Sequence, residues 1–207
     1  MSAPEILRDG PAGAAVTIVL AHGAGAGMEH PFLAAVAAGL GAAGFAVLRF
    51  EFPHQHEARH GMRRGPDRLP VLQDCFRDVV REHARPPFVL AGKSMGGRVA
   101  TTIADGLGAA GVIVFGYPFH PPRRPTQLRT AHLAELATPT LILQGERDPF
   151  GTRAEVAGYV LSPKIEVFWL ADGDHSLVPR KRSGHTEHGH LQAAIERAAG
   201  FAAAVTR

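Results

Sequence analysis

The chain has a single cysteine, Cys75, among its 207 residues, which excludes an internal disulfide. So little cysteine is typical of a protein from a reducing compartment. No segment approaches the roughly 20 consecutive apolar residues that are needed to cross a bilayer. The first residues are interrupted by charged side chains and lack the apolar centre of a signal peptide. We therefore expect a cytoplasmic protein that does not bind membranes.

Net charge and aromatic residues are also scarce. There are 22 Lys and Arg against 19 Asp and Glu, and Phe, Trp and Tyr make up 7% of the chain. A net charge of +3 does not indicate a nucleic-acid partner, and the compact basic run Arg180-Lys181-Arg182 is more typical of a solvated loop. The chain is 45% hydrophobic, which is enough for a substantial core. Its length predicts a single domain spanning residues 1–207.

Short apolar runs, most of them rich in β-branched residues, alternate along the chain with helical stretches. The predicted strands are residues 16–21, 45–50, 88–91, 112–115, 140–144 and 165–170. The predicted helices are residues 31–43, 69–84, 95–107, 153–160 and 186–205. Most of the strands are apolar throughout, as in a parallel sheet covered on both faces, whereas Glu166 marks the last one as an edge strand. This order predicts an α/β fold, a doubly wound and mostly parallel sheet of about six strands.

Two stretches, residues 53–70 and 117–138, fit neither pattern. Both follow predicted strands, so they should lie at the edge of the sheet where α/β proteins bind ligands. Only residues 117–138 have the position of a cap, and they are too few to form a cap domain. We therefore expect a fold without a large lid.

The motif Gly92-Lys93-Ser94-Met95-Gly96 directly follows the apolar run at residues 88–91. A serine between two glycines, at the end of a buried strand and before a helix, is typical of a nucleophile elbow. Glycine lets the strand and the helix approach the sharp turn closely, because it has no Cβ. The motif predicts that the Ser94 hydroxyl is held at the tip of the sheet as a nucleophile.

A serine hydroxyl needs a base, and the base needs a carboxylate that fixes its tautomer. In this architecture both are expected after later strands, in the order Ser, Asp, His. Asp148 follows the predicted strand at residues 140–144, and His175 follows the one at 165–170. We predict that His175 is the base and Asp148 its carboxylate, with Glu146 as the nearest substitute for Asp148.

An oxyanion also needs backbone N–H donors. Met95 N–H, at the start of the helix after Ser94, is the first candidate. The second should come from the glycine-rich loop after the first predicted strand, where Ala24 is preferred and Gly25 is the alternative. His22 in the same loop is expected to orient it rather than to react.

These motifs give the chain a family resemblance over nearly its whole length. The motifs are His22-Gly23-Ala24-Gly25, Arg49-Phe50-Glu51-Phe52-Pro53, Gly92-Lys93-Ser94-Met95-Gly96-Gly97-Arg98 and Asp174-His175-Ser176-Leu177. The chain resembles the α/β-hydrolases, and more narrowly a small capless branch near the dienelactone hydrolases. That branch includes bacterial predicted hydrolases, testis-expressed proteins and a subunit of the chromatin-bound non-specific-lethal complex. The resemblance implies a nucleophile at Ser94, an acid at Asp148 and a base at His175.

Dienelactone hydrolases carry a cysteine as nucleophile where this chain has serine, so their substrate does not transfer. The predicted activity is hydrolysis of a small or accessible acyl ester through a Ser94 acyl-enzyme, with no cofactor. The same residues would also serve acyl transfer. The alternative, which follows from the chromatin-associated relatives, is a hydrolase-like scaffold for protein interaction with little or no turnover.

Four basic residues are candidates for substrate contacts: Lys93, His54, Arg63 and Arg64. Lys93 occupies the exposed position of the elbow, where it would attract an anionic substrate or, alternatively, be solvated or paired within the protein. The histidine clusters are His54, His56 and His60, and His185, His188 and His190. Neither cluster has a nearby cysteine or a well-spaced acidic partner, so we expect no metal site. The sequence does not indicate an oligomeric state.

Overall fold

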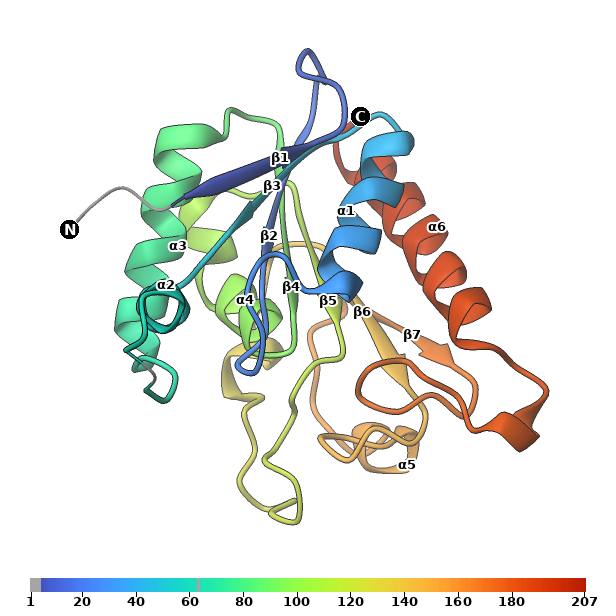
Figure 1. The fold of residues 1–207 in the computed structure, drawn as a ribbon. Helices are drawn as coiled ribbons and strands as arrows, with labels where there is room; N and C mark the ends of the chain where they lie inside the picture. Colours follow the sequence, from blue (N-terminus) through green and yellow to red (C-terminus); the bar gives the residue numbers. More distant parts are fainter. Residues whose placement is uncertain (1–4, 63) are drawn as a thin grey trace.

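The computed structural model describes residues 5–62 and 64–207, and over these residues the chain forms one sheet of seven strands (Figure 1). Their order in the sheet is β1-β3-β2-β4-β5-β6-β7. The strands are β1 (Ile6–Asp9), β2 (Thr17–Ala21), β3 (Ala46–Phe50), β4 (Phe88–Lys93), β5 (Gly111–Phe115), β6 (Thr140–Gly145) and β7 (Ile165–Leu170). Only the β1–β3 pairing is antiparallel. The predicted α/β class is confirmed, as is the edge position of β7.

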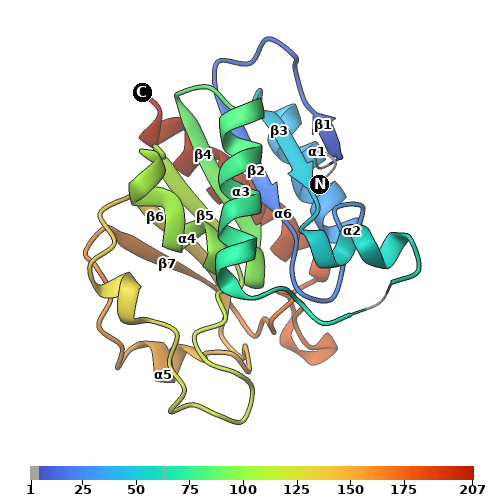
Figure 2. The same ribbon diagram turned by 90° about the vertical axis from the view of Figure 1, so that its left-hand side faces the viewer.

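Helices cover both faces of the sheet (Figures 1 and 2). On one face, α1 (Pro31–Ala42) and α6 (Glu187–Val205) pack through leucine, valine and alanine side chains. On the other face, α3 (Leu69–His83) and α4 (Met95–Leu107) cover a second cluster that is richer in phenylalanine. Strands β2, β4, β5 and β6 have buried side chains on both faces, which accounts for their mostly apolar sequence.

Strand β1 is absent from the sequence prediction, which gave about six strands. Its four residues, Ile6–Asp9, mix apolar and charged side chains and are too short to show a period. Tertiary contacts define the strand instead. It pairs with β3, and Asp9 accepts hydrogen bonds from the Arg49 guanidinium at 2.8 and 3.0 Å. This antiparallel strand therefore occupies the edge of the sheet opposite β7.

The helical predictions differ from the structure mainly in the loops. Within the unassigned residues 53–70, the chain forms α2 (Pro53–Arg59). The helix predicted at residues 153–160 is only α5 (Arg153–Val156), which begins with a capping box between Thr152 and Glu155. Residues 117–138 contain one short 3-10 helix, η1 (Ala131–Ala134), and a second, η2 (Lys181–Ser183), precedes α6. No cap domain is inserted anywhere in the described residues.

Parallel strands bring the chain segments that follow them to the same edge of the sheet. The segments after β2, β4, β6 and β7 carry the predicted catalytic and oxyanion residues, and they meet at the carboxyl ends of these neighbouring strands. Within the described ranges, no helix combines the length and the apolar character needed to cross a membrane.

Candidate active site

The turn between β4 and α4 is as sharp as the sequence predicts. Ser94 has φ 51° and ψ −112°, a conformation that non-glycine residues rarely adopt. A Cβ on Gly92 would overlap the backbone of Gly96, and one on Gly96 would lie 2.6 Å from the His22 carbonyl oxygen. Glycine at these two positions therefore lets α4 begin directly against β4 and against the loop after β2. The strained serine at the turn is typical of a functional site.

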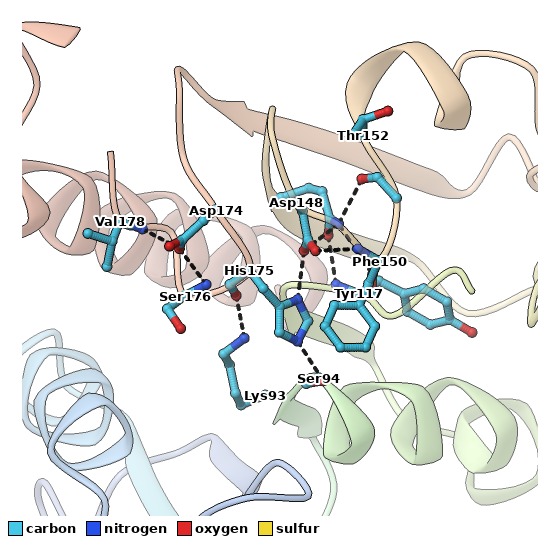
Figure 3. A network of polar contacts seen from close by, with 12 residues as sticks. Lys93, Ser94, Tyr117, Asp148, Phe150, Thr152, Asp174, His175, Ser176 and Val178 are labelled. Atoms are coloured by element: carbon cyan, nitrogen blue, oxygen red, sulfur yellow. Dashed lines mark hydrogen bonds and ion pairs between the residues drawn. The ribbon is translucent and has the colours of Figure 1, made fainter. Parts of the chain in front are cut away.

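His175 lies between Ser94 and Asp148 (Figure 3). Its Nε2 is 2.8 Å from Ser94 Oγ, and its Nδ1 is 2.7 Å from Asp148 Oδ2. The Asp148 side chain is fully buried, whereas 20% of the His175 side chain is exposed. The structure therefore brings together three residues separated by up to 81 positions, in a continuous hydrogen-bonded chain.

The two loops that carry Asp148 and His175 are held by their own side chains. Asp174 Oδ1 accepts hydrogen bonds from Ser176 N and Val178 N at 2.8 and 3.0 Å, which closes the turn around His175. The ring of Phe150 packs on the imidazole of His175, with 4.2 Å between the ring centroids. These contacts fix the direction of the imidazole before any substrate is present.

Burial is the main influence on the titration of His175. It lowers the pKa of the imidazole from the ordinary histidine value, because the charged form loses solvation. The hydrogen bond to Asp148 raises this pKa, and the charge of Lys93 lowers it. The net effect favours a neutral imidazole, which has a free lone pair for the Ser94 proton.

The candidate oxyanion donors lie on two chain segments beside Ser94, the start of α4 and the loop after β2. Met95 is the first residue of α4, so its N–H has no partner within the helix. Ala24 and Gly25 both line the cavity beside Ser94, and the geometry does not separate these two candidates for the second donor.

His22 holds the loop that carries Ala24 and Gly25. It is completely buried, its Nδ1 lies 2.7 Å from Gly23 O, and its Nε2 accepts a hydrogen bond from Phe52 N at 3.0 Å. Burial lowers its pKa to about 4, so the ring stays neutral near pH 7. The structure supports the predicted structural part for this histidine.

A cavity of about 760 Å³ opens beside Ser94 and His175. Its wall comes from the loop after β2, the first turns of α1 and α6, the elbow and the loops after β6 and β7. The lining residues are Gly23, Ala24, Gly25, Ala26, His30, Pro31, Phe32, Leu33, Ala35, Lys93, Ser94, Phe150, His175, Ser176, Glu187 and Leu191. Most of this wall is apolar, as expected for a pocket that receives a small organic group.

The predicted exposure of Lys93 is wrong. The side chain is half-buried, and its ammonium donates a hydrogen bond to the main-chain oxygen of His175 at 2.5 Å (Figure 3). The sequence places Lys93 at the outward position of the elbow but cannot show that the loop after β7 folds over it. Lys93 is therefore paired within the protein, which was the stated alternative to attracting an anionic substrate.

Lys93 lines the cavity, but two of the other predicted substrate contacts, His54 and Arg64, do not. His54 is buried in α2, where its backbone N and its Nδ1 contact Asp67 Oδ2 at 2.9 and 3.1 Å, and it does not line the cavity. Arg64 forms ion pairs with Glu57 and Asp67 instead of reaching the site. Arg63 lies outside the described residues. His54 is taken into the packing of α2, and Arg64 is drawn to Glu57 of the same helix.

Of the two carboxylates considered for His175, Asp148 is the one that contacts it. Glu146 forms an ion pair with Arg153 at 2.7 Å and accepts a hydrogen bond from Asp172 N, so it faces away from His175. Among residues 5–62 and 64–207, no group of three or more His, Cys, Asp or Glu side chains is arranged to hold a metal ion.

Comparison with known proteins decides the family. The model of the alpha/beta hydrolase domain matches residues 14–203. The chain belongs to the alpha/beta hydrolase family. Its fold is similar to an alpha-beta serine hydrolase homologue from Coxiella burnetii, at 22% identity and a TM-score of 0.70, over 96% of this chain and 91% of that one.

Two further solved structures have a fold similar to that of this alpha/beta hydrolase. A serine hydrolase without lid from Xanthomonas campestris is 19% identical, with a TM-score of 0.67 over 98% of this chain and 87% of that one. A dienelactone hydrolase from Anabaena variabilis is 19% identical, with a TM-score of 0.73 over the full length of both chains. The predicted resemblance to the dienelactone-hydrolase-like branch is confirmed.

The structure shows three residues at the site that the sequence analysis did not select: Gln144, Phe150 and Gly116. Gln144 is buried and donates a hydrogen bond to Asp148 Oδ2 at 2.8 Å. Phe150 covers the imidazole of His175. Gly116 lies beside the loop of His175, where a Cβ would be 2.8 Å from His175 O. A polar residue after the apolar run of β6 was a usable signal for Gln144, whereas Phe150 and Gly116 carried none.

Proposed function

We propose that this alpha/beta hydrolase is a serine esterase that cleaves small or accessible acyl esters through a Ser94 acyl-enzyme. The observation that carries the proposal is the hydrogen-bonded chain Ser94–His175–Asp148, with Ser94 strained at the elbow and open to the cavity. A scaffold for protein interaction has no need of such a chain.

The chemistry follows from the direction of each hydrogen bond. Nδ1–H of His175 donates to Asp148, which leaves the Nε2 lone pair facing the Ser94 hydroxyl. Ser94 Oγ attacks the ester carbonyl while its proton passes to Nε2. The N–H groups of Met95 and of Ala24 or Gly25 would receive the oxyanion.

The leaving alcohol takes the proton from His175, and the acyl group stays on Ser94. Water then attacks the acyl-enzyme as His175 removes its proton, which releases the acid and restores Ser94. Each step uses only groups of this chain, water and the ester. The mostly apolar wall contributed by Pro31, Phe32 and Leu191 supports an acyl group without charge as the part of the substrate that enters the cavity.

The first prediction tests the nucleophile. Replacing Ser94 by Ala removes the attacking oxygen, so hydrolysis of p-nitrophenyl acetate and butyrate should fall by about 10³-fold or more. Ser183→Ala, in the turn before α6, is the matched control and should keep the wild-type rate. A fluorophosphonate, which reacts only with an activated serine, should label Ser94 in the wild type, as located by mass spectrometry.

The same experiment separates the alternatives. A folded wild-type protein that neither turns over esters nor reacts with the fluorophosphonate would favour the scaffold for protein interaction. Undiminished hydrolysis by Ser94→Ala would place the nucleophile elsewhere. Labelling at Ser94 without ester hydrolysis would leave an activated serine with another acyl substrate or acceptor.

A further inference from the structure

Lys93 is the last residue of β4 and directly precedes Ser94, but the chemistry proposed above does not use it. Its side chain runs toward the loop after β7, where Nζ donates to the main-chain oxygen of His175 at 2.5 Å (Figure 3). The residue before the proposed nucleophile thus contacts the backbone of the proposed base. This hydrogen bond joins the end of β4 to a loop 82 positions away, in addition to the bond between Ser94 and His175.

The end of β5 leaves room for this ammonium. Gly116 has φ +71°, and a Cβ there would lie 2.8 Å from His175 O and 3.0 Å from Lys93 Nζ. Any side chain at residue 116 would therefore displace either the ammonium or the His175 loop. The absence of a Cβ at Gly116 is a second observation, independent of the hydrogen bond, that Lys93 Nζ and His175 O occupy a space shaped for both.

The charge of Lys93 has no direct counter-ion. None of the ion pairs among the described residues includes Lys93, and Asp148 and Asp174 act on it only through their longer-range charge. On the α1 side, the Phe32 ring centroid lies 5.9 Å from Nζ. The other titratable groups of the cavity wall are His30 at the start of α1 and Glu187 at the start of α6. Among the described residues, the ammonium thus contacts the His175 loop without forming an ion pair with a carboxylate.

We propose that Lys93 is a positioning residue of this site: its ammonium fixes the main chain of His175 and places a positive charge beside the imidazole. The inference rests on the proposed function, because it assigns Lys93 a part in preparing His175 as the base. Nζ holds the loop that aims Nε2 at Ser94 Oγ. A positive charge beside His175 also opposes a second positive charge on the imidazole.

The titration of the two groups agrees with this arrangement. Burial lowers the pKa of Lys93 to about 8, so the amine remains protonated below neutral pH, where His175 titrates. The charge of Lys93 in turn lowers the pKa of His175. Activity should therefore persist to a lower pH than it would without Lys93, because protonated His175 cannot accept the Ser94 proton.

The second prediction compares Lys93→Met with Lys93→Gln. Methionine keeps the length of the side chain but has neither charge nor donor, whereas glutamine keeps a donor on a shorter, uncharged side chain. The readout is the rate of fluorophosphonate labelling of Ser94 between pH 5 and 9. We expect Lys93→Met to lower the plateau rate by about 10- to 100-fold, because a misaimed base costs about this much.

The pH profile distinguishes positioning from general stability. In both variants the acid limb of the profile should move to higher pH, since both lack the charge, and Lys93→Gln should lose less of the plateau rate. Lys164→Met, an exposed lysine just before β7 at the opposite end of the sheet, is the matched control and should leave rate and profile unchanged. The pH at which the acid limb lies does not depend on the fraction of protein that is folded. A variant that folds poorly therefore still shows whether the limb has moved.

Three outcomes would overturn the inference. A profile of Lys93→Met that matches that of Lys164→Met would show that Lys93 does not act on His175. A lower plateau rate of labelling with an unmoved acid limb would show that Lys93 only supports the local structure and that its charge does not act on His175. Absence of labelling in the wild type would remove the proposed function itself, whereas the first two outcomes leave that function standing.

Discussion

The carboxylate of Asp148 accepts hydrogen bonds from other residues besides His175. Oδ2 accepts hydrogen bonds from His175 Nδ1 at 2.7 Å and from Gln144 Nε2 at 2.8 Å, and Oδ1 accepts one from Phe150 N at 2.8 Å. Gln144 Oε1 in turn accepts from Tyr117 N at 2.7 Å. A buried carboxylate needs such donors, because an unpartnered charge inside a protein is costly. Gln144 therefore orients Asp148 and also ties it to the end of β5.

The third prediction concerns Gln144 itself. Gln144→Met keeps most of the side-chain volume but removes the donor to Asp148 and the acceptor for Tyr117 N. Leaving a buried group without a partner should lower the free energy of unfolding by about 1–3 kcal/mol. The labelling rate of Ser94 should also fall, by about tenfold or more, because Asp148 loses one of the contacts that orient it. Urea denaturation and labelling kinetics give the two measurements.

Gln73→Met is the matched control for this prediction. Gln73 lies on α3, is half-buried and donates to Thr102 Oγ1 at 2.9 Å, away from the active site. The Gln73→Met variant should unfold at nearly the same urea concentration as the wild type and keep the wild-type labelling rate. If Gln144→Met were as stable and as reactive as Gln73→Met, Gln144 would have no part in orienting Asp148.

The residues of the site differ in how far the sequence predicts them. Ser94, Asp148 and His175 were selected because their chemistry requires particular side chains at strand ends, and the structure places them in contact. Lys93 and His54 were misplaced, because the direction of a long or aromatic side chain depends on loops packed over it. Sequence position predicts which strand end a residue follows, but it does not predict whether its side chain faces solvent or the interior.

At the scale of elements, the position of the site depends on how closely α4 approaches the sheet. A Cβ on Gly96 would lie 2.6–2.8 Å from the His22 and Ala21 oxygens and from the Ala21 Cβ. A Cβ on Gly97 would overlap Val114 of β5. Backbone atoms of a central strand cannot move aside, so only glycine allows this contact. Ser94 then emerges between β2 and β5, with both strand ends beside it.

The fourth prediction compares the substitution of two glycines of α4 by alanine. Alanine is the better helix former by about 1 kcal/mol, so Gly→Ala stabilises an exposed helical site. Gly106 is exposed and a Cβ there would meet nothing within 4 Å, so Gly106→Ala should raise the free energy of unfolding by about 0.5–1 kcal/mol. Gly96→Ala should instead lower it by about 1–3 kcal/mol, because the added methyl overlaps the β2 backbone.

Urea denaturation measures the free energy of unfolding of both variants. The substitution and the helix are the same, so the expected rise in one variant and the expected fall in the other can be compared directly. Gly96→Ala should also lower the Ser94 labelling rate, since α4 must shift to relieve the overlap, whereas Gly106→Ala should not affect it. Equal stabilisation by both substitutions would show that α4 does not need a glycine for its approach to β2.

Elements were predicted well where the core alone defines them. Strands β2, β5 and β6 are apolar over most of their length because both of their faces are buried, and α4 matches its predicted bounds. The four-residue strand β1 was missed, because its pairing with β3 and the Asp9–Arg49 ion pair are tertiary contacts. Segment α2 was also missed, since its buried face consists of polar residues such as His54 rather than an apolar stripe.

At the scale of the whole molecule, the entrance to the site is built from the fold itself. The cavity lies between the first turns of α1 and α6, which pack side by side on one face of the sheet (Figure 1). Gly39 of α1 and Ile195 of α6 approach so closely that a Cβ on Gly39 would lie 2.6 Å from Ile195 Cγ2. No inserted segment covers this entrance in the described part of the chain. The cavity therefore does not depend on a lid that must open.

The fifth prediction follows from this open entrance. A lid that opens at a lipid surface makes the rate rise abruptly once an ester exceeds its solubility, and a site without a lid has no such transition. With tributyrin, the rate of acid release measured at constant pH should saturate smoothly and continue through the solubility limit without a jump. Ser94→Ala sets the background rate at each concentration. An abrupt increase at the solubility limit would mean that part of the chain closes over Ser94 in solution and opens at the interface, contrary to the entrance formed by α1 and α6.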